Sequence, residues 1–161
     1  MRAKRAPESV TRLERAASAL KDHGLPLTIQ RRRLLEGFLE RTDHPSAETL
    51  YRETLPLLPG LSRATVYRTL EKLVELGLVE RIGHPGSHAR YDPRTERHHH
   101  LVCGRCGAVR DHEAAKLDAL PLPDASTGFE VSDYTVQFRG TCAACRARGS
   151  KRARRSRRSS Q

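Results

Sequence analysis

The sequence predicts an α+β fold, in which an N-terminal winged helix-turn-helix domain is followed by a small α/β domain with a four-cysteine metal site. Apolar residues recur at helical spacing as far as Gly77, and beyond it they alternate as in β-strands. All four cysteines fall in two Cys-x-x-Cys pairs in the second half of the chain. In a chain of 161 residues with no Trp and 4 % aromatic residues, each half has a small aliphatic core that a bound metal would help to stabilise.

Four helices are expected in the first half, after a flexible arm over residues 1–9. The first helix ends before Gly24 and Pro26. The second and fourth helices follow hydroxyl residues that suit an N-cap, Thr28 and Ser62, and Pro45-Ser46 opens the third. The apolar positions at helical spacing are Leu13, Ala16, Ala17 and Leu20, then Leu34, Leu35, Phe38 and Leu39, then Leu50, Tyr51 and Leu55, and finally Val66, Leu70 and Leu73.

Two short strands are expected after the helices, over residues 78–82 and 89–91, around turn-forming residues 83–87. Helices followed by such a hairpin are typical of a winged helix-turn-helix. Residues 1–92 are therefore predicted to form a DNA-binding domain, and the polar, proline-containing residues 92–97 a hinge.

The second domain is predicted over residues 93–146, with strands at 98–103 and 107–111 and a short helix at 113–120. A longer strand is expected from Phe129 to Arg139, because apolar residues alternate along it. Residues 147–161 are rich in Arg and Ser and are predicted to be a disordered basic tail.

The net charge of +11 is concentrated near the C-terminal end of the sequence. Eight positive charges lie within residues 146–158, which leaves +3 for residues 1–145. The total charge therefore says little about the body of the protein. No stretch has the roughly 18 apolar residues of a membrane span, and the first residues lack the apolar core of a signal peptide. We expect a cytoplasmic protein with no membrane partner.

The cysteine pairs are Cys103-x-x-Cys106 and Cys142-x-x-Cys145. In a reducing compartment, cysteines indicate metal ligands or catalytic thiols before disulfides. Two Cys-x-x-Cys pairs can direct four thiolates to one tetrahedral ion with no open position, which is typical of structural zinc. Buried, unrelated cysteines or a redox pair are the alternatives, but neither pair opens a long helix as redox pairs do.

A histidine run, His98-His99-His100, precedes the first cysteine pair. Residues i and i+2 of a strand share a face, so His98 and His100 can bind one ion while His99 points away. With carboxylates nearby, such a pair suits divalent iron, manganese or zinc. Alone, the same pattern is equally compatible with plain surface histidines.

Three motifs carry a family resemblance. Residues 43–51 (DHPSAETLY) are similar to a segment HP-x-A-x-x-(I/L)-Y, residues 62–70 (SRATVYRTL) to a recognition helix, and residues 98–107 (HHHLVCGRCG) to a signature HxH-L-x-C-x-x-C-G. With the second cysteine pair in its expected place, more than 100 residues from His44 to Cys145 resemble the ferric uptake regulator (Fur) family.

The resemblance implies a homodimeric, metal-dependent repressor whose second domain dimerises. It also implies a regulatory metal ion held by five positions, which match His44, Asp92, His98, His100 and Asp111. Iron-sensing members commonly have glutamate where this chain has Asp92 and Asp111, whereas peroxide-sensing members have aspartate. Residues for an accessory metal site are poorly matched, since Arg97 and Tyr134 stand at two of its positions and only Asp118 falls near a third. Both features favour the peroxide-sensing branch.

In that branch, iron(II) or manganese(II) at the five positions favours the DNA-binding arrangement of the dimer. Peroxide acting on the ferrous form modifies a histidine ligand, with His44 and His98 as candidates, and the operator is released. Manganese supports repression without that reaction.

Contacts with double-stranded operator DNA are expected from the fourth helix. Arginine and threonine suit base edges and phosphates in the major groove. The candidates are Arg63, Thr65, Tyr67, Arg68 and Thr69, with weaker candidates at Arg31, Arg32 and Arg33 and in the wing at His84, His88 and Arg90.

Three other functions would each account for part of the sequence. A zinc enzyme is disfavoured, because the cysteine site is closed and no general base accompanies the histidines, so no catalytic residues and no small-molecule substrate are predicted. A zinc-ribbon RNA-binding or interaction module would leave the winged helix unexplained. A Fur-type repressor that senses iron or zinc without peroxide differs only in the carboxylates at positions 92 and 111.

Overall fold

The computed structural model describes residues 8–83, 89–124, 126 and 128–148. It divides into two compact units, residues 1–95 and residues 96–161. Residues 1–7 of the expected arm, His84 and His88 of the wing, and residues 149–161 of the expected tail lie outside the described residues. Residues 8 and 9 belong to the first helix, and residues 147 and 148 are helical.

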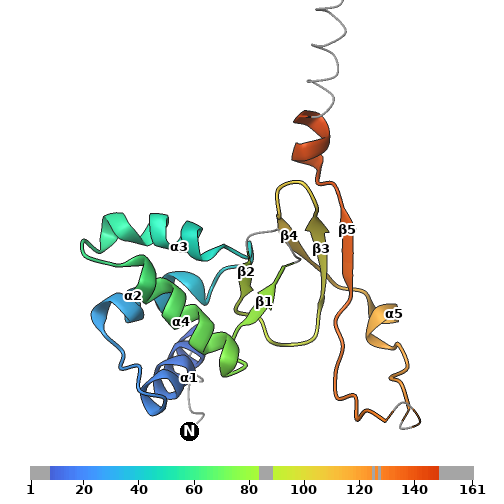
Figure 1. Cartoon of the computed structure of the whole chain (residues 1–161), viewed down its shortest axis with the longest axis horizontal. Helices are drawn as coiled ribbons and strands as arrows, with labels where there is room; N and C mark the ends of the chain where they lie inside the picture. Colours follow the sequence, from blue (N-terminus) through green and yellow to red (C-terminus); the bar gives the residue numbers. More distant parts are fainter. Residues whose placement is uncertain (1–7, 84–88, 125, 127, 149–161) are drawn as a thin grey trace, which may run out of the picture. The chain divides into compact units, whose positions relative to one another are not determined.

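The first unit contains the four expected helices (Figure 1). They are α1 (Glu8–Asp22), α2 (Ile29–Phe38), α3 (Ala47–Thr54) with a 3₁₀ turn after it at Leu55–Leu57, and α4 (Arg63–Glu75). The predicted N-caps Thr28 and Ser62 are confirmed, and Ser46 caps α3 in the same way. Each hydroxyl accepts a hydrogen bond from the backbone N–H three residues later in the chain. After α4, Gly77 adopts φ 66°, a left-handed conformation that ends the helix.

The core of the first unit is aliphatic, as its composition requires. Leu20, Phe38, Val66, Leu70 and Leu73 are fully buried and come from α1, α2 and α4. Burying such a side chain contributes roughly 1.5–3 kcal/mol. The predicted apolar spacing is therefore the buried face of these helices.

A hairpin follows, formed by β1 (Glu80–Ile82) and β2 (Arg90–Asp92) in antiparallel register. Two contacts fix β2 within this unit. The Tyr91 amide donates to the Pro45 carbonyl at 3.0 Å, and the Tyr91 hydroxyl donates to the Glu71 carboxylate on α4 at 2.6 Å. The strand that ends at Asp92 is thus bonded both to the start of α3 and to α4.

The second unit contains a three-stranded sheet of order β4-β3-β5 and a short helix (Figure 1). Its elements are β3 (His99–Cys103), β4 (Val109–His112), α5 (Ala115–Asp118), β5 (Gln137–Gly140) and a helical segment at residues 143–148. β3 pairs antiparallel with β4 and parallel with β5, where Cys103 stands opposite Gly140. No helix among the described residues could span a membrane.

The long strand predicted from Phe129 to Arg139 is wrong, because the strand begins only at Gln137. A strand needs a partner for its ladder of hydrogen bonds. In the parallel register, His100 stands opposite Gln137, so residues before 136 would have to pair with residues that precede β3. Side-chain alternation predicts a pleated segment, but it does not show where the neighbouring strand starts.

Candidate functional site

The four cysteines gather at one end of the sheet in the second unit. One ligand atom from each lies within 4.8 Å of the other three. The sulfurs of Cys106 and Cys142 are 3.8 Å apart, and none of these four cysteines forms a disulfide. With Zn–S bonds of ~2.3 Å, the edge of a tetrahedral site is about 3.8 Å. The cluster therefore fits a four-thiolate zinc ion.

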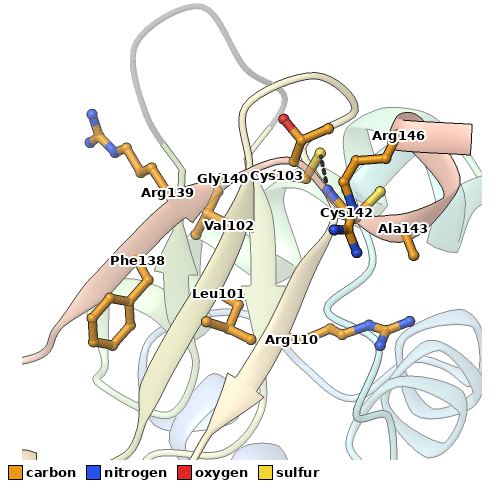
Figure 2. Close-up of a pocket in the computed structure, with 12 residues that line it drawn as sticks. Leu101, Val102, Cys103, Arg110, Phe138, Arg139, Gly140, Cys142, Ala143 and Arg146 are labelled. Atoms are coloured by element: carbon orange, nitrogen blue, oxygen red, sulfur yellow. Dashed lines mark hydrogen bonds between the residues drawn. The ribbon is translucent and has the colours of Figure 1, made fainter. Parts of the chain in front are cut away.

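The fold builds this cluster from the β3–β5 pairing. Cys103 ends β3, and Cys142 follows the strand whose Gly140 stands opposite it. The Cys142 amide donates to the Cys103 sulfur at 3.3 Å (Figure 2). Gly107 closes the turn of the first pair with φ 66° and donates its amide to the Cys103 carbonyl. Such a left-handed position costs little only for glycine.

The protonation of the thiols reflects their crowding. Backbone N–H groups, that of Cys142 foremost, lower the pKa of Cys103 to about 6. Hydrogen bonds with the sulfurs of Cys106 and Cys142 raise the pKa of Cys145 to about 12. Amide groups thus favour the thiolate form of Cys103, whereas the neighbouring sulfurs favour the protonated form of Cys145. A divalent cation would replace the thiol protons, since thiolates are the metal-binding form.

Three of the predicted regulatory ligands lie together in the second unit. The rings of His98 and His100 meet edge to face at 4.5 Å between centroids. His98 Nε2 lies 3.6 Å from an Asp111 carboxylate oxygen, and His100 stands opposite Asp111 in the β3–β4 register. His98 Nδ1 is 2.7 Å from the Glu96 carbonyl, which can only accept, so Nδ1 carries the proton and Nε2 bears the lone pair. This tautomer is the one that an imidazole needs to bind a metal ion through Nε2.

His99 points elsewhere. Its Nε2 lies 3.2 Å from Asp118, and its ring stacks at 6.3 Å on Tyr134. Arg97 lies over the same Tyr134 ring at 4.9 Å and pairs with Asp133 at 2.8 Å. The residues at the accessory-site positions are therefore engaged with one another by stacking and ion pairs.

The other two predicted ligands lie together in the first unit. His44 Nε2 is 3.1 Å from an Asp92 carboxylate oxygen, and both side chains are buried. His44 adopts φ 50°, and it is the one non-glycine residue among those described with positive φ. A residue before proline is disfavoured even in the right-handed α region, so this backbone is strained. The Tyr91–Pro45 hydrogen bond and a 3.5 Å contact from Arg90 to the His44 carbonyl help to hold it.

The predicted DNA-contacting residues of α4 differ in exposure. Arg63, Tyr67 and Arg68 are exposed, and Thr65 is partly buried. Thr69 was expected on this surface, but it is buried and its hydroxyl donates to the Thr65 carbonyl. With 3.6 residues per turn, Thr69 lies about one turn after Thr65 and next to the buried Leu70, so its side chain faces the core.

The sequence did not predict which side chains contact α4 and His44. Tyr91 hydrogen-bonds Glu71 of α4, and Glu48 accepts hydrogen bonds from Arg63, the first residue of α4. Glu48 lies within residues 43–51, but at a position where the motif specifies no residue type. Arg90 reaches the His44 carbonyl, and the three arginines of α2 hydrogen-bond to residues near them.

Comparison with known proteins points to one family. The chain matches the ferric uptake regulator family over residues 22–139. It is 29 % identical over 138 residues to the peroxide-responsive repressor PerR of Staphylococcus epidermidis, covering 85 % of this chain and 92 % of that protein. Among solved structures, the Vibrio cholerae ferric uptake regulator has a TM-score of 0.60 and 30 % identity, covering 78 % of this chain and 98 % of that one. The Helicobacter pylori ferric uptake regulator shares the fold, with a TM-score of 0.70 at 20 % identity, covering 89 % and 97 %.

A winged helix joined to a metal-capable sheet domain defines a metal-dependent DNA-binding regulator of transcription. The chain belongs to the ferric uptake regulator family. The expectation that it is not an enzyme is confirmed, because the family consists of transcriptional regulators. Regulators of this family are dimeric DNA-binding proteins, and the zinc-ribbon alternative leaves the first unit unexplained.

Proposed function

We propose that this regulator is a peroxide-responsive repressor, whose operator binding depends on iron(II) or manganese(II) held by His44, Asp92, His98, His100 and Asp111. The observation that carries the proposal is the carboxylate choice: an aspartate accompanies histidine in each unit, Asp92 at 3.1 Å from His44 and Asp111 at 3.6 Å from His98. Similarity to peroxide-responsive repressors at 29 % identity over most of both chains supports it.

The donor set suits the proposed ions. Imidazole nitrogens and carboxylate oxygens are ligands that iron(II), manganese(II) and zinc share. Which of these ions is bound therefore depends on the geometry of the site and on which metal is available. Two of the five residues belong to the first unit and three to the second. An ion that takes donors from both units favours one arrangement of the DNA-binding unit, by the difference in its affinity for the alternatives.

Within the first unit, bonded contacts connect the proposed ligands with the DNA-binding helix. Asp92 follows Tyr91, whose hydroxyl hydrogen-bonds Glu71 on α4, and His44 precedes Pro45, whose carbonyl accepts the Tyr91 amide. A change in how His44 and Asp92 are held therefore acts on residues bonded to α3 and α4. In the proposed mechanism, these contacts are enough to connect metal binding at His44 and Asp92 with α3 and α4.

Ferrous iron bound there would supply the electrons that reduce peroxide and leave an oxidant beside its ligands. His44 and His98 each offer a ring that can gain an oxygen, and an oxidised imidazole no longer presents the same lone pair. The loss of a ligand would be irreversible, so each molecule would respond once.

We propose that Arg63, Thr65, Tyr67 and Arg68 contact the DNA. We also propose that the four cysteines hold a closed zinc site and that the second unit forms a homodimer. β5 is an edge strand of its sheet. Leu101 and Phe138, which line a hollow of about 440 Å³ beside the cysteines, are more than two-fifths exposed (Figure 2). An open edge with exposed apolar neighbours is a surface that a second copy can cover.

The test is DNA binding by protein loaded with ferrous iron, manganese or zinc, each with and without dilute peroxide. The probe is a duplex selected from a random pool by the manganese-loaded protein. We expect peroxide to release only the ferrous protein, with an added oxygen on the peptide holding His44 or His98. A ferrous protein that stays bound, with neither histidine modified, would make this chain an iron- or zinc-sensing repressor instead.

A further inference from the structure

The guanidinium of Arg63 is held by two side chains of α3. Its Nε and Nη2 lie 3.0 and 3.2 Å from the two carboxylate oxygens of Glu48. The same guanidinium lies over the Tyr51 ring, 4.5 Å from its centroid. Glu48 and Tyr51 are three residues apart on one helix, so they share a face. The first residue of the DNA-binding helix is thus fixed from two directions.

The geometry leaves part of the guanidinium for another partner. A guanidinium has five N–H groups in a rigid fork, and the two bonds to Glu48 use two of them. The Nη1 amine and one N–H of Nη2 remain, and these are the paired donors that match the O6 and N7 acceptors of guanine. Arg63 is 61 % exposed, so this edge is open to solvent.

Stability does not explain the arrangement. Glu48 is 42 % exposed, and ion pairs between exposed side chains add little to the free energy of unfolding. The Arg63 guanidinium lowers the pKa of Glu48, so this carboxyl stays ionised and continues to face the arginine. By contrast Arg68, exposed on the same helix, has no ion-pair partner among the described residues.

We propose that Glu48 and Tyr51 are positioning residues that hold Arg63 in one pose to read a guanine edge, and that they serve sequence discrimination rather than affinity. The proposal rests on the proposed function, in which α4 contacts operator DNA. Glu48 cancels the charge that Arg63 would bring to any phosphate backbone, which reduces attraction to DNA of every sequence. A fixed arginine loses little freedom when it meets the correct base, but it cannot reorient toward a wrong one.

The experiment compares affinity for the selected duplex with affinity for a scrambled duplex of equal length. The full-length protein carries manganese, and the variants are Glu48→Gln, Arg63→Lys and the double variant. Glu48→Gln should bind the scrambled duplex more tightly, with a log–log salt slope steeper by about 0.9. Its ratio of selected to scrambled affinity should fall about tenfold, within the range of one bidentate base contact. Arg63→Lys should show the same fall in this ratio although the positive charge is kept, and in the double variant the ratio should fall no further.

A matched control is Glu53→Gln, which removes the same charge from the same helix and the same kind of pair, here with Arg41. Its ratio should stay that of the native protein. A Glu48→Gln protein with the native ratio would overturn the positioning role, as would an equal fall in the Glu53→Gln control, which would indicate charge alone. If the native protein selects no sequence from the pool, the proposed function fails first and the inference fails with it.

Discussion

At the scale of single residues, His44 combines a metal-capable ring with a strained backbone. Its φ of 50° before Pro45 costs of order 1 kcal/mol or more, and such strain persists where the surroundings hold it. Histidine and asparagine tolerate this region better than alanine. The backbone at this position therefore favours few residue types, chiefly glycine, asparagine, aspartate and histidine, and histidine is one of those whose side chain can bind a divalent metal.

We expect His44→Asn to abolish metal-dependent DNA binding, because the left-handed backbone is kept while the imidazole is lost. His44→Ala should do the same with an added loss of stability of about 1 kcal/mol. Zinc content and dimerisation should stay native in both. The control is His23→Ala, at an exposed histidine of the same unit. Manganese-dependent binding in the asparagine variant at native affinity would remove His44 from the ligand set.

Asp111 tests the carboxylate choice on which the peroxide proposal depends. Asp111→Glu keeps a carboxylate but adds a methylene, so manganese-dependent DNA binding should persist. Release of the ferrous form by peroxide should slow about tenfold, which corresponds to about 1.4 kcal/mol in the barrier. Stopped-flow measurement of operator release gives the rate. An unchanged rate would mean that the aspartate is not what makes the site reactive.

At the scale of elements, the cysteine cluster and the small sheet depend on each other. β3 supplies Cys103, the turn supplies Cys106, and the segment after β5 supplies the other two. Binding energy in a structural zinc site is also folding energy, of order 10–16 kcal/mol in zinc-finger peptides. The three-stranded sheet would otherwise have few buried apolar residues, since Val102 and Val109 are the buried valines of β3 and β4.

Cys103→Ser should therefore unfold the second unit and lose stoichiometric zinc, while the first unit keeps its helices. Prolonged chelation of the native protein should have the same effect. Circular dichroism, zinc analysis and sedimentation report the three consequences. A Cys103→Ser protein that stays dimeric, retains its thermal midpoint and binds one zinc per chain would exclude the cluster as a stabilising site.

The elements also show what the sequence could and could not predict. The N-caps Thr28, Ser46 and Ser62 were predictable, because capping depends on residues within one turn. The strand from Phe129 was not, because its length depends on where β3 begins. The pairing of Glu48 with Arg63, 15 residues apart, was equally hidden, since only the packing of α3 against α4 brings the two side chains together.

At the scale of the whole molecule, the proposal concerns coupling between two ligands. To move a two-state equilibrium from about 1:99 to 99:1, an ion must bind the DNA-competent form about 10⁴-fold more tightly than the other form. Linkage then requires that DNA tighten the binding of the ion by the same factor by which the ion tightens the binding of DNA. Coupling therefore has two independent readouts in one protein.

We expect the manganese affinity of the native protein to rise when the selected duplex is present, and not when the scrambled duplex is. Calorimetric titration of manganese with and without each duplex measures the factor, and titration of the duplex with and without manganese must return the same value. In His44→Asn the coupling factor should fall toward one, because Asp92 is then the single proposed donor that remains in the first unit. If manganese and the selected duplex bind the native protein independently, the ion does not regulate DNA binding. If the coupling survives in His44→Asn, it runs through other ligands, since an ion can bias only those arrangements for which its affinity differs.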